Sequence, residues 1–168
     1  MNRLHIIAGP PASGKTTYGR ALASRLGATF LDIDSASEAI VRAGLKLAGK
    51  DPGDRDSPVF KKTFRIPIYD TLFQIAGQNL KNMDVVIVGP FTSEMRDAEW
   101  LETIGQRFQA PIEIHYVTCN PEERRRRMQL RNESRDASKL ADWANHLAYY
   151  ENEPRPAFEH RFVDTSSD

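Results

Sequence analysis

Hydrophobic and polar positions along the chain form two recurring patterns. Short apolar runs typical of buried strands lie at 4–8, 29–33, 85–88, 112–117 and 161–163. Segments with apolar residues at helical spacing separate them, at 16–26, 37–47, 69–80, 97–108, 121–131 and 137–150. The run VVIV at 85–88 is the most strand-like and predicts a central strand covered on both faces. Strands that alternate with helices predict a parallel sheet with helices on both sides.

In such a sheet, ligands bind beyond the carboxyl ends of the strands. Three stretches with functional character follow predicted strands: the loop that begins at Gly9, the pair Asp32 and Asp34, and GPFT at 89–92. We expect one crevice to hold all three. Residues 49–58 are polar and rich in turn formers, so we expect a mobile loop there.

The stretch GPPASGKT at 9–16 fits the Walker A pattern G-x-x-x-x-G-K-[ST]. Glycines let the backbone curl so that N–H groups surround a phosphate. Lys15 would add a positive charge for the β- and γ-phosphates, and the Thr16 hydroxyl could ligate Mg²⁺. The alternative is a turn followed by a chance Lys-Thr pair, which the flanking strand and helix disfavour. We therefore expect the phosphates of a nucleoside triphosphate to contact Gly9, Pro10, Pro11, Ala12, Ser13, Gly14, Lys15, Thr16 and Thr17.

Two carboxylates, Asp32 and Asp34, end the second predicted strand in FLDIDS. Residues two apart in a strand share a face, so both could approach the bound phosphate. One could hold Mg²⁺ or its water shell, and the other could orient an acceptor hydroxyl and take its proton. The alternative is that Asp34 only caps the next helix and Asp32 is a solvated strand end.

An arginine-rich segment near the C-terminus, NPEERRRRMQLRNESRDASKLADW, contains six arginines. On a helix, Arg127 and Arg131 share one face, which Arg124 joins, and Arg135 falls at a polar break where a lid could close. Arginine forks stabilise the charge that develops in phosphoryl transfer. For Arg125 and Arg126 we favour a solvated basic face instead.

The composition of the chain argues against some classes of binding partner. Lys plus Arg and Asp plus Glu number 23 each, so no overall charge draws this 168-residue chain to nucleic acid or membrane. The length fits one domain, and no apolar stretch approaches the ~20 residues of a membrane helix. The first predicted strand leaves no room for a signal peptide, and the single Cys119 fits a reducing cytosol. We therefore expect a cytoplasmic protein.

The blocks GPPASGKT, LDID, VVIVGPFTSEMRD and RMQLRNESRDASKLADW together resemble the small P-loop kinases of the zeta-toxin-like and polynucleotide-kinase-like group. Shikimate and gluconate kinases are more distantly similar. The resemblance spans roughly residues 4 to 165. It implies an α/β three-layer P-loop NTPase fold with a five-stranded parallel sheet and an arginine-bearing lid. It also implies ATP, Mg²⁺ and transfer of the γ-phosphoryl group to a hydroxyl.

The resemblance also suggests roles by position. Asp34 matches the acceptor-activating carboxylate, Asp32 resembles the magnesium-associated aspartate, and Arg131 and Arg135 match lid arginines. We expect residues 1–168 to form one domain, and the resemblance implies substrate contacts in 35–80 and a lid in 121–140.

Further contacts follow from the same resemblance. Arg42 and Arg65 are the cations that would meet the substrate, and Asp164 and Thr165 would pass near the adenine. Arg127 would contact the nucleotide. Phe91 and Thr92 could line the acceptor pocket, or could form only a helix-capping turn.

One departure keeps other functions open. Many P-loop proteins end the third strand with an acidic Mg²⁺ partner, but here Val88 is followed by Gly89, and Asp84 precedes the strand. Either Asp32 takes the metal role or catalysis is weak. The leading hypothesis is a kinase for a small-molecule hydroxyl. The alternatives are a polynucleotide 5′-hydroxyl kinase, which the arginine run favours and the neutral charge disfavours, and a nucleotide-binding regulator or NTPase.

Overall fold

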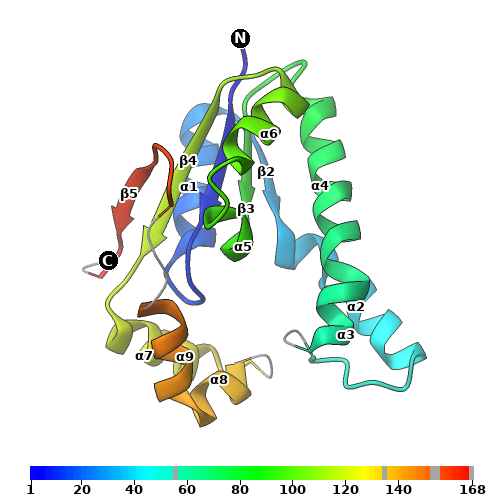
Figure 1. Cartoon of the computed structure of the whole chain (residues 1–168), viewed down its shortest axis with the longest axis vertical. Helices are drawn as coiled ribbons and strands as arrows, with labels where there is room; N and C mark the ends of the chain where they lie inside the picture. Colours follow the sequence, from blue (N-terminus) through cyan, green and yellow to red (C-terminus); the bar gives the residue numbers. More distant parts are fainter. Residues whose placement is uncertain (55–56, 134–135, 152–155, 167–168) are drawn as a thin grey trace.

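The computed structural model describes residues 1–54, 57–133, 136–151 and 156–166. Its centre is a sheet of five strands in the order β2-β3-β1-β4-β5 (Figure 1). The strands are β1 (Leu4–Ala8), β2 (Thr29–Asp32), β3 (Val85–Val88), β4 (Ile112–Thr118) and β5 (Arg161–Asp164). All neighbouring pairs are parallel. The predicted α/β class, the parallel sheet and all five strand positions are thus confirmed, each strand end to within one residue.

Helices connect the strands. They are α1 (Lys15–Leu26), α2 (Ile33–Leu47), α3 (Pro58–Phe60), the π-helical turn η1 (Lys61–Arg65), α4 (Ile66–Asn79), α5 (Thr92–Met95), α6 (Trp100–Phe108), α7 (Pro121–Arg131), α8 (Ala137–Ala141) and α9 (Trp143–Glu151). The predicted helix at 137–150 is in fact two helices, because Asp142 has a non-helical backbone (φ −126°, ψ 60°). The predicted helix at 37–47 begins earlier, at Ile33, because the Asp32 side chain caps it by accepting from the Ser35 N–H.

The sheet separates two hydrophobic layers. On one face, alternate strand residues such as Ile6 and Ile87 pack with Phe73 of α4 and Ile104 of α6. On the other face, Ile7, Val86, Val88 and Val117 pack against Leu22 and Ala23 of α1. Alternation along parallel strands produces both layers, as P-loop folds require.

Close packing of α1 on the sheet depends on Gly19. A Cβ at this position would lie 2.5 Å from a methyl of Val88. A larger residue would push α1 away from β3 and displace the phosphate-binding loop that leads into this helix. The spacing of helix and sheet therefore helps to position the site.

The carboxyl ends of the strands point toward two groups of helices, α7–α9 on one side and α2–α3 on the other (Figure 1). Residues from both groups line one cavity. Among the described residues, no helix is both long enough and apolar enough to cross a bilayer.

Candidate functional site

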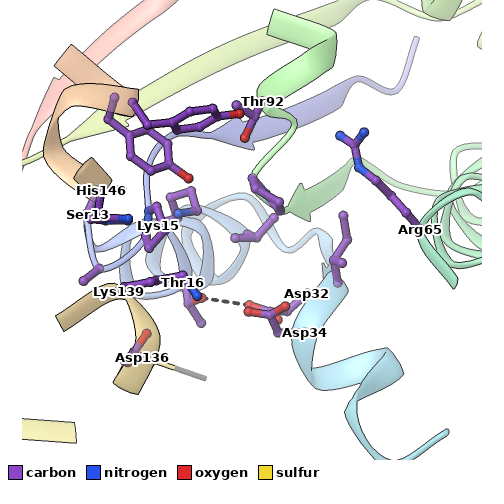
Figure 2. A pocket seen from close by; sticks show the side chains of 18 of the residues that line it. Ser13, Lys15, Thr16, Asp32, Asp34, Arg65, Thr92, Asp136, Lys139 and His146 are labelled. Atoms are coloured by element: carbon purple, nitrogen blue, oxygen red, sulfur yellow. Dashed lines mark hydrogen bonds between the residues drawn. The ribbon is translucent and has the colours of Figure 1, made fainter. Parts of the chain in front are cut away.

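A cavity of about 790 Å³ lies beyond the carboxyl ends of β1, β2 and β3. Its walls include the loop at 11–17, Asp32 and Asp34, and the segment that follows β3. The structure therefore brings together the three stretches expected to share a crevice. Figure 2 shows the loop residues Lys15 and Thr16 on one side and Arg65 on the opposite side.

The loop that follows β1 has the backbone that its sequence predicts. Gly9 (φ 142°) and Gly14 (φ 84°) occupy the left-handed half of backbone space that glycine favours. A Cβ on Gly9 would lie 2.0 Å from the Val117 carbonyl oxygen, so only glycine fits beside β4. Gly14 immediately precedes α1, and the loop therefore ends at a helix N-terminus, which attracts anions.

Two observations show that the loop suits an anion. The partly buried ammonium of Lys15 donates to the Pro10 carbonyl at 2.6 Å. Burial lowers the pKa of Lys15 to about 8; Asp34 and Asp32 raise it, while Arg131 and Arg124 lower it. The buried Ser13 hydroxyl has no hydrogen-bond partner among the residues described. Phosphate oxygens would compensate the lysine charge and accept from Ser13, so the loop fits a nucleotide's phosphates.

Thr16 and Asp32 provide oxygen atoms that could hold a magnesium ion. The Thr16 hydroxyl donates to an Asp32 carboxylate oxygen at 2.8 Å (Figure 2). Asp32 is buried at the end of β2 and pairs in register with Val88 of β3. Its carboxylate therefore lies next to the strand end where many P-loop proteins carry an acid. Hydroxyl and carboxylate oxygens suit a hard cation such as Mg²⁺.

Asp34 lines the same cavity, but for a different reason from the one expected. The prediction placed both aspartates on one strand face, whereas β2 ends at Asp32 and Asp34 lies in the first turn of α2. The helix cap is also Asp32 and not Asp34. Asp34 is exposed and close enough to Lys15 to raise its pKa. The helix start brings Asp34 to the cavity wall beside Asp32.

Arg127 joins α7 to the C-terminal segment and the phosphate loop. Its guanidinium donates to the Thr165 hydroxyl at 3.0 Å and to the Thr165 carbonyl at 2.8 Å. The Thr165 hydroxyl in turn donates to the Ser13 carbonyl at 2.8 Å. Thr165 thus supports the loop directly, and Arg127 supports it through Thr165. Asp164 is exposed and accepts from the Ser166 N–H, so it does not take part in this support.

The remaining arginines of α7 separate into distinct environments. Arg131 lines the cavity and forms a two-pronged ion pair with buried Asp136 (Nη2–Oδ1 2.7 Å). Arg124 was expected to join the face of Arg127 and Arg131, but it is buried against the rings of Trp143 and Tyr150. The reason is that α9 packs aromatic side chains against this position of α7.

The expected solvated face contains Arg125 and Arg126. Both side chains are exposed, and Arg126 pairs with Glu123 at 2.6 Å. The predicted lid residue Arg135 lies outside the described residues.

The expected acceptor residues also differ in placement. Arg65 and Thr92 line the cavity. The Arg65 guanidinium donates to Glu94 at 2.7 Å and to Ser93 at 3.1 Å, and lies 5.0 Å from the centre of the Tyr69 ring. Burial raises the pKa of the Tyr69 hydroxyl to about 12.

Two expected acceptor residues do not line the cavity. Arg42 pairs with Glu38 along α2 and is half exposed. Phe91 was expected to face the acceptor, but it is fully buried and packs against Phe73 and Trp100 in the core. The left-handed backbone of Phe91 (φ 47°) starts α5 and leaves Thr92 facing the cavity.

Several wall residues were not anticipated from the sequence. They are Tyr69, Ser93, Lys139, His146, Tyr149 and Tyr150. Tyr150 of α9 also packs against Arg124. The spacing of His146, Tyr149 and Tyr150 was a signal of a shared helix face, but it did not reveal that part of this face meets the cavity.

The fold and the phosphate loop define the protein's class as a P-loop nucleotide-binding protein. Residues 4–152 match a family model described as an AAA domain. The chain belongs to this family, and the family and fold imply that it binds a nucleotide. The resemblance to P-loop kinases is thereby confirmed.

Individual relatives agree with this class. A shikimate kinase from Saccharopolyspora erythraea is 45% identical over 62 residues, which cover 36% of this chain and 33% of that protein. The match therefore spans about a third of the relative's length.

Solved structures below 25% identity support the fold alone. A Chloroflexus aurantiacus protein described as a candidate kinase has a TM-score of 0.69 at 18% identity, covering 99% of this chain and 89% of that one. A gluconokinase from Sinorhizobium meliloti has a TM-score of 0.60 at 16% identity, covering 96% and 81%. Kti12 from Chaetomium thermophilum, solved with ADP-AlF3, has a TM-score of 0.62 at 20% identity, covering 98% and 89%.

Proposed function

We propose that this protein is an ATP-dependent kinase that transfers the γ-phosphoryl group to a hydroxyl of a small-molecule acceptor. One observation carries the proposal. The cavity continues from the phosphate loop past Asp34 to a second polar wall that includes Arg65, Tyr69 and Thr92. A site built only to hold a nucleotide has no need of this extension. The extension provides room for an acceptor next to the position of the γ-phosphate.

Asp34 would act on the acceptor. It is the exposed carboxylate on the cavity wall between the loop and the second wall. In the transfer, the acceptor oxygen forms a bond to the γ-phosphorus while the bond from phosphorus to the β,γ-bridging oxygen breaks and ADP leaves. The acceptor proton goes to the Asp34 carboxylate. Orientation and proton acceptance by one carboxylate are typical of kinases.

Lys15 and Arg131 would stabilise the moving group. Lys15 is held within the loop by the Pro10 carbonyl, and Arg131 lies on the facing helix α7. Arg131 must exchange part of its contact with Asp136 for the phosphoryl oxygens, which makes its contribution greatest in the transition state. Arg135 would act from the same lid segment.

Thr16 and Asp32 would hold Mg²⁺, which neutralises phosphate charge when bound. Asp32 accepts from the Thr16 hydroxyl and lies beside Val88, so it supplies the carboxylate that the third strand lacks. Its second oxygen accepts from the Ser35 N–H, which fixes the orientation of the carboxyl group. This placement supports the kinase over the alternative in which the missing acid leaves catalysis weak.

The arginine run gives little support to a polynucleotide acceptor. Arg124 is buried among aromatic rings, Arg126 and Arg127 pair with Glu123, and Arg131 pairs with Asp136. A nucleic-acid surface needs several basic groups directed at phosphates. Among the described residues, α7 instead uses most of its arginines for contacts within the protein.

The proposal is tested by measuring ADP formation from MgATP with a library of hydroxyl-bearing metabolites and, separately, a single-stranded oligonucleotide. We expect one small acceptor to increase turnover well above slow hydrolysis, and Asp34→Asn to remove the increase. Turnover that no metabolite increases, together with stimulation by the oligonucleotide, would overturn the small-molecule assignment. Nucleotide binding with hydrolysis that no acceptor changes would identify a nucleotide-dependent regulator.

A further inference from the structure

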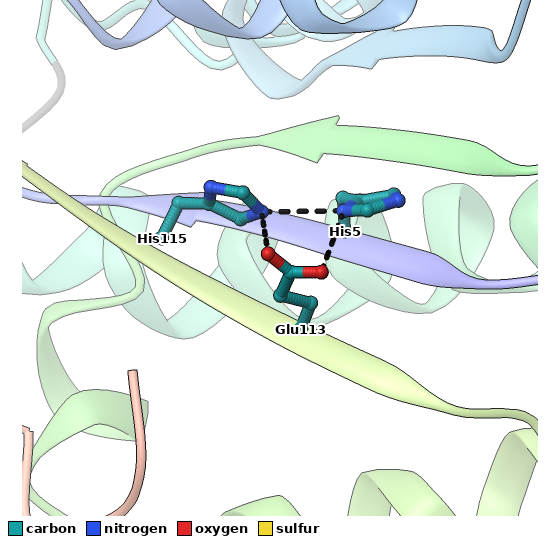
Figure 3. A group of neighbouring side chains, drawn as sticks. All are labelled: His5, Glu113 and His115. Carbon is teal, nitrogen blue, oxygen red and sulfur yellow. Dashed lines mark hydrogen bonds and ion pairs between the residues drawn. The ribbon is translucent and has the colours of Figure 1, made fainter. Parts of the chain in front are cut away.

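Three ligating side chains meet on the sheet, away from the cavity. His5 lies on β1, and Glu113 and His115 lie on the neighbouring strand β4 (Figure 3). In the register of these strands, His5 pairs with Glu113 and Ile7 pairs with His115. All three side chains alternate with residues of the α4 and α6 layer, so they lie on the α1 face of the sheet. Sequence spacing concealed the cluster, because 110 residues separate His5 from His115.

The ligating atoms of the three residues converge. His5 Nδ1 lies 3.2 Å from His115 Nε2, and Glu113 Oε1 lies 3.4 Å from the same nitrogen. Glu113 Oε2 lies 3.8 Å from His5 Nδ1. Four-coordinate zinc with bonds of about 2.0–2.1 Å places adjacent ligand atoms roughly 3.3–3.4 Å apart. The separations of His5 Nδ1 and Glu113 Oε1 from His115 Nε2 are close to this tetrahedral edge, and the separation of Glu113 Oε2 from His5 Nδ1 is longer.

The surroundings of His115 suit a metal ligand. The Tyr18 hydroxyl lies 2.8 Å from Nδ1, the ring nitrogen directed away from the other two ligands. A partner at the second nitrogen fixes the ring and its tautomer, as is typical of ligating histidines. His115 is fully buried and His5 is nearly so, whereas the Glu113 side chain is 28% exposed. Glu113 therefore provides a path for an ion from solvent.

We propose that His5, Glu113 and His115 form a binding site for a divalent transition-metal ion of the zinc class. Two imidazole nitrogens and one carboxylate favour Zn²⁺ over Mg²⁺, which prefers oxygen ligands. The site is separate from the nucleotide cavity. His5 lies four positions before Gly9 along the extended chain, which is a distance of roughly 13 Å. Its three ligands would clamp β1 to β4 below the phosphate loop.

Two arginines near Glu113 carry positive charge that disfavours binding of a metal ion. Arg3 donates to Glu113 Oε2 at 2.8 Å, and Arg161 lies 4.0 Å from Glu113 Oε1. An incoming dication competes with Arg3 for the charge of the Glu113 carboxylate. The Arg3 side chain is 49% exposed, so it can turn into solvent. Removing Arg3 should therefore strengthen binding, which a purely structural cluster of hydrogen bonds does not predict.

The test uses the full chain after EDTA treatment, titrated with Co²⁺ in excess Mg²⁺ so that the Thr16–Asp32 position does not compete. We expect one Co²⁺ per chain, a tetrahedral absorption band in the visible region, and displacement by Zn²⁺. His5→Gln and Glu113→Gln should weaken binding at least ~10-fold. Arg3→Gln should tighten it. The matched control is His160→Gln, a histidine whose Nδ1 contacts only the Phe158 carbonyl among the polar contacts described, and it should bind Co²⁺ normally.

Thermal unfolding without metal checks that each variant is folded. If His5→Gln does not fold, the partly exposed Glu113→Gln decides the question. The proposal is overturned if the wild-type chain binds no Co²⁺, or if His160→Gln loses binding while Glu113→Gln keeps it. Either result would leave His5 and His115 as a hydrogen-bonded pair of core residues.

Discussion

The Thr16 hydroxyl donates a hydrogen bond to the Asp32 carboxylate at 2.8 Å, which joins the start of α1 to the end of β2. We propose that this contact compensates for the absence of an acid after the third strand. Strand β2 is the outer neighbour of β3, and Asp32 pairs with Val88. The Asp32 carboxylate, at the end of the strand next to β3, therefore reaches the Thr16 hydroxyl, which is expected to ligate Mg²⁺.

Asp32→Asn tests whether the carboxylate at the end of β2 does the work of the acid that is missing after β3. The amide oxygen can still accept from the Ser35 N–H, so the cap of α2 should persist. The negative charge is lost, so Mg²⁺-dependent tightening of nucleotide binding should fall. Calorimetric titration with ATP, with and without Mg²⁺, measures the difference. An unchanged Mg²⁺ effect would show that the metal is held elsewhere.

Asp34→Asn should have the opposite profile. MgATP should bind nearly as well as to the wild type, while transfer to the acceptor falls by ~10²–10⁴-fold, the usual scale for a general base. Binding is measured by titration and transfer by ADP release. If Asp34→Asn loses Mg²⁺-dependent binding and Asp32→Asn loses only transfer, the two roles are reversed.

Lys15→Ala should abolish measurable ATP affinity or transfer without lowering the melting temperature. The lysine makes its polar contact within the loop, with the Pro10 carbonyl, and burial lowers its pKa to about 8. Removing this partly buried ammonium removes the free-energy cost of burying its charge in the protein without nucleotide. Lys46→Ala on the exposed last turn of α2 is the matched control. Equal ATP affinity in both variants would remove Lys15 from the mechanism.

Acid should destabilise the protein through His115. Burial lowers the pKa of His115 to about 4; Glu113 opposes this, while His5, Arg161 and Arg25 lower the pKa further. In the unfolded chain His115 has its ordinary pKa of 6.5, so as pH falls it binds a proton before the folded chain does. The free energy of unfolding should therefore fall as pH drops from about 6.5 to about 4 and level off below. Denaturant unfolding in EDTA across this range measures it, and a flat profile would contradict the burial of a neutral imidazole.

Local patterns were sufficient for the scaffold and the phosphate loop. VVIV at 85–88 and GPPASGKT at 9–16 each carry their structural meaning within a few residues, since burial on both faces and left-handed glycines are local requirements. The side-chain environments were less predictable, because they depend on long-range packing. Phe91 enters the core because α4 and α6 supply aromatic partners, and Arg124 is buried because α9 folds back on α7. The cluster of His5, Glu113 and His115 depends on the register between β1 and β4, which no single segment reveals.

The arginines of the expected lid segment, residues 121–140, provide the sharpest test of the lid. Arg131→Ala and Arg135→Ala should each reduce turnover with the acceptor by at least ~10-fold while changing ATP affinity far less, because charge develops on the phosphoryl oxygens mainly in the transition state. Arg125→Ala and Arg126→Ala should be nearly silent, since both side chains are exposed.

Loss of Arg131 also removes its ion pair with Asp136, whose side chain is buried at 1% exposure. A buried carboxylate that loses its partner lowers the melting temperature. The double variant Arg131→Ala with Asp136→Asn removes this carboxylate charge and so separates the effect on stability from the effect on turnover. If the double variant regains its melting temperature but not its turnover, Arg131 acts on the reaction. Equal losses at all four arginines would indicate a general basic surface and favour a nucleic-acid acceptor. Full turnover in every variant would refute the lid and leave a nucleotide-binding regulator as the better account.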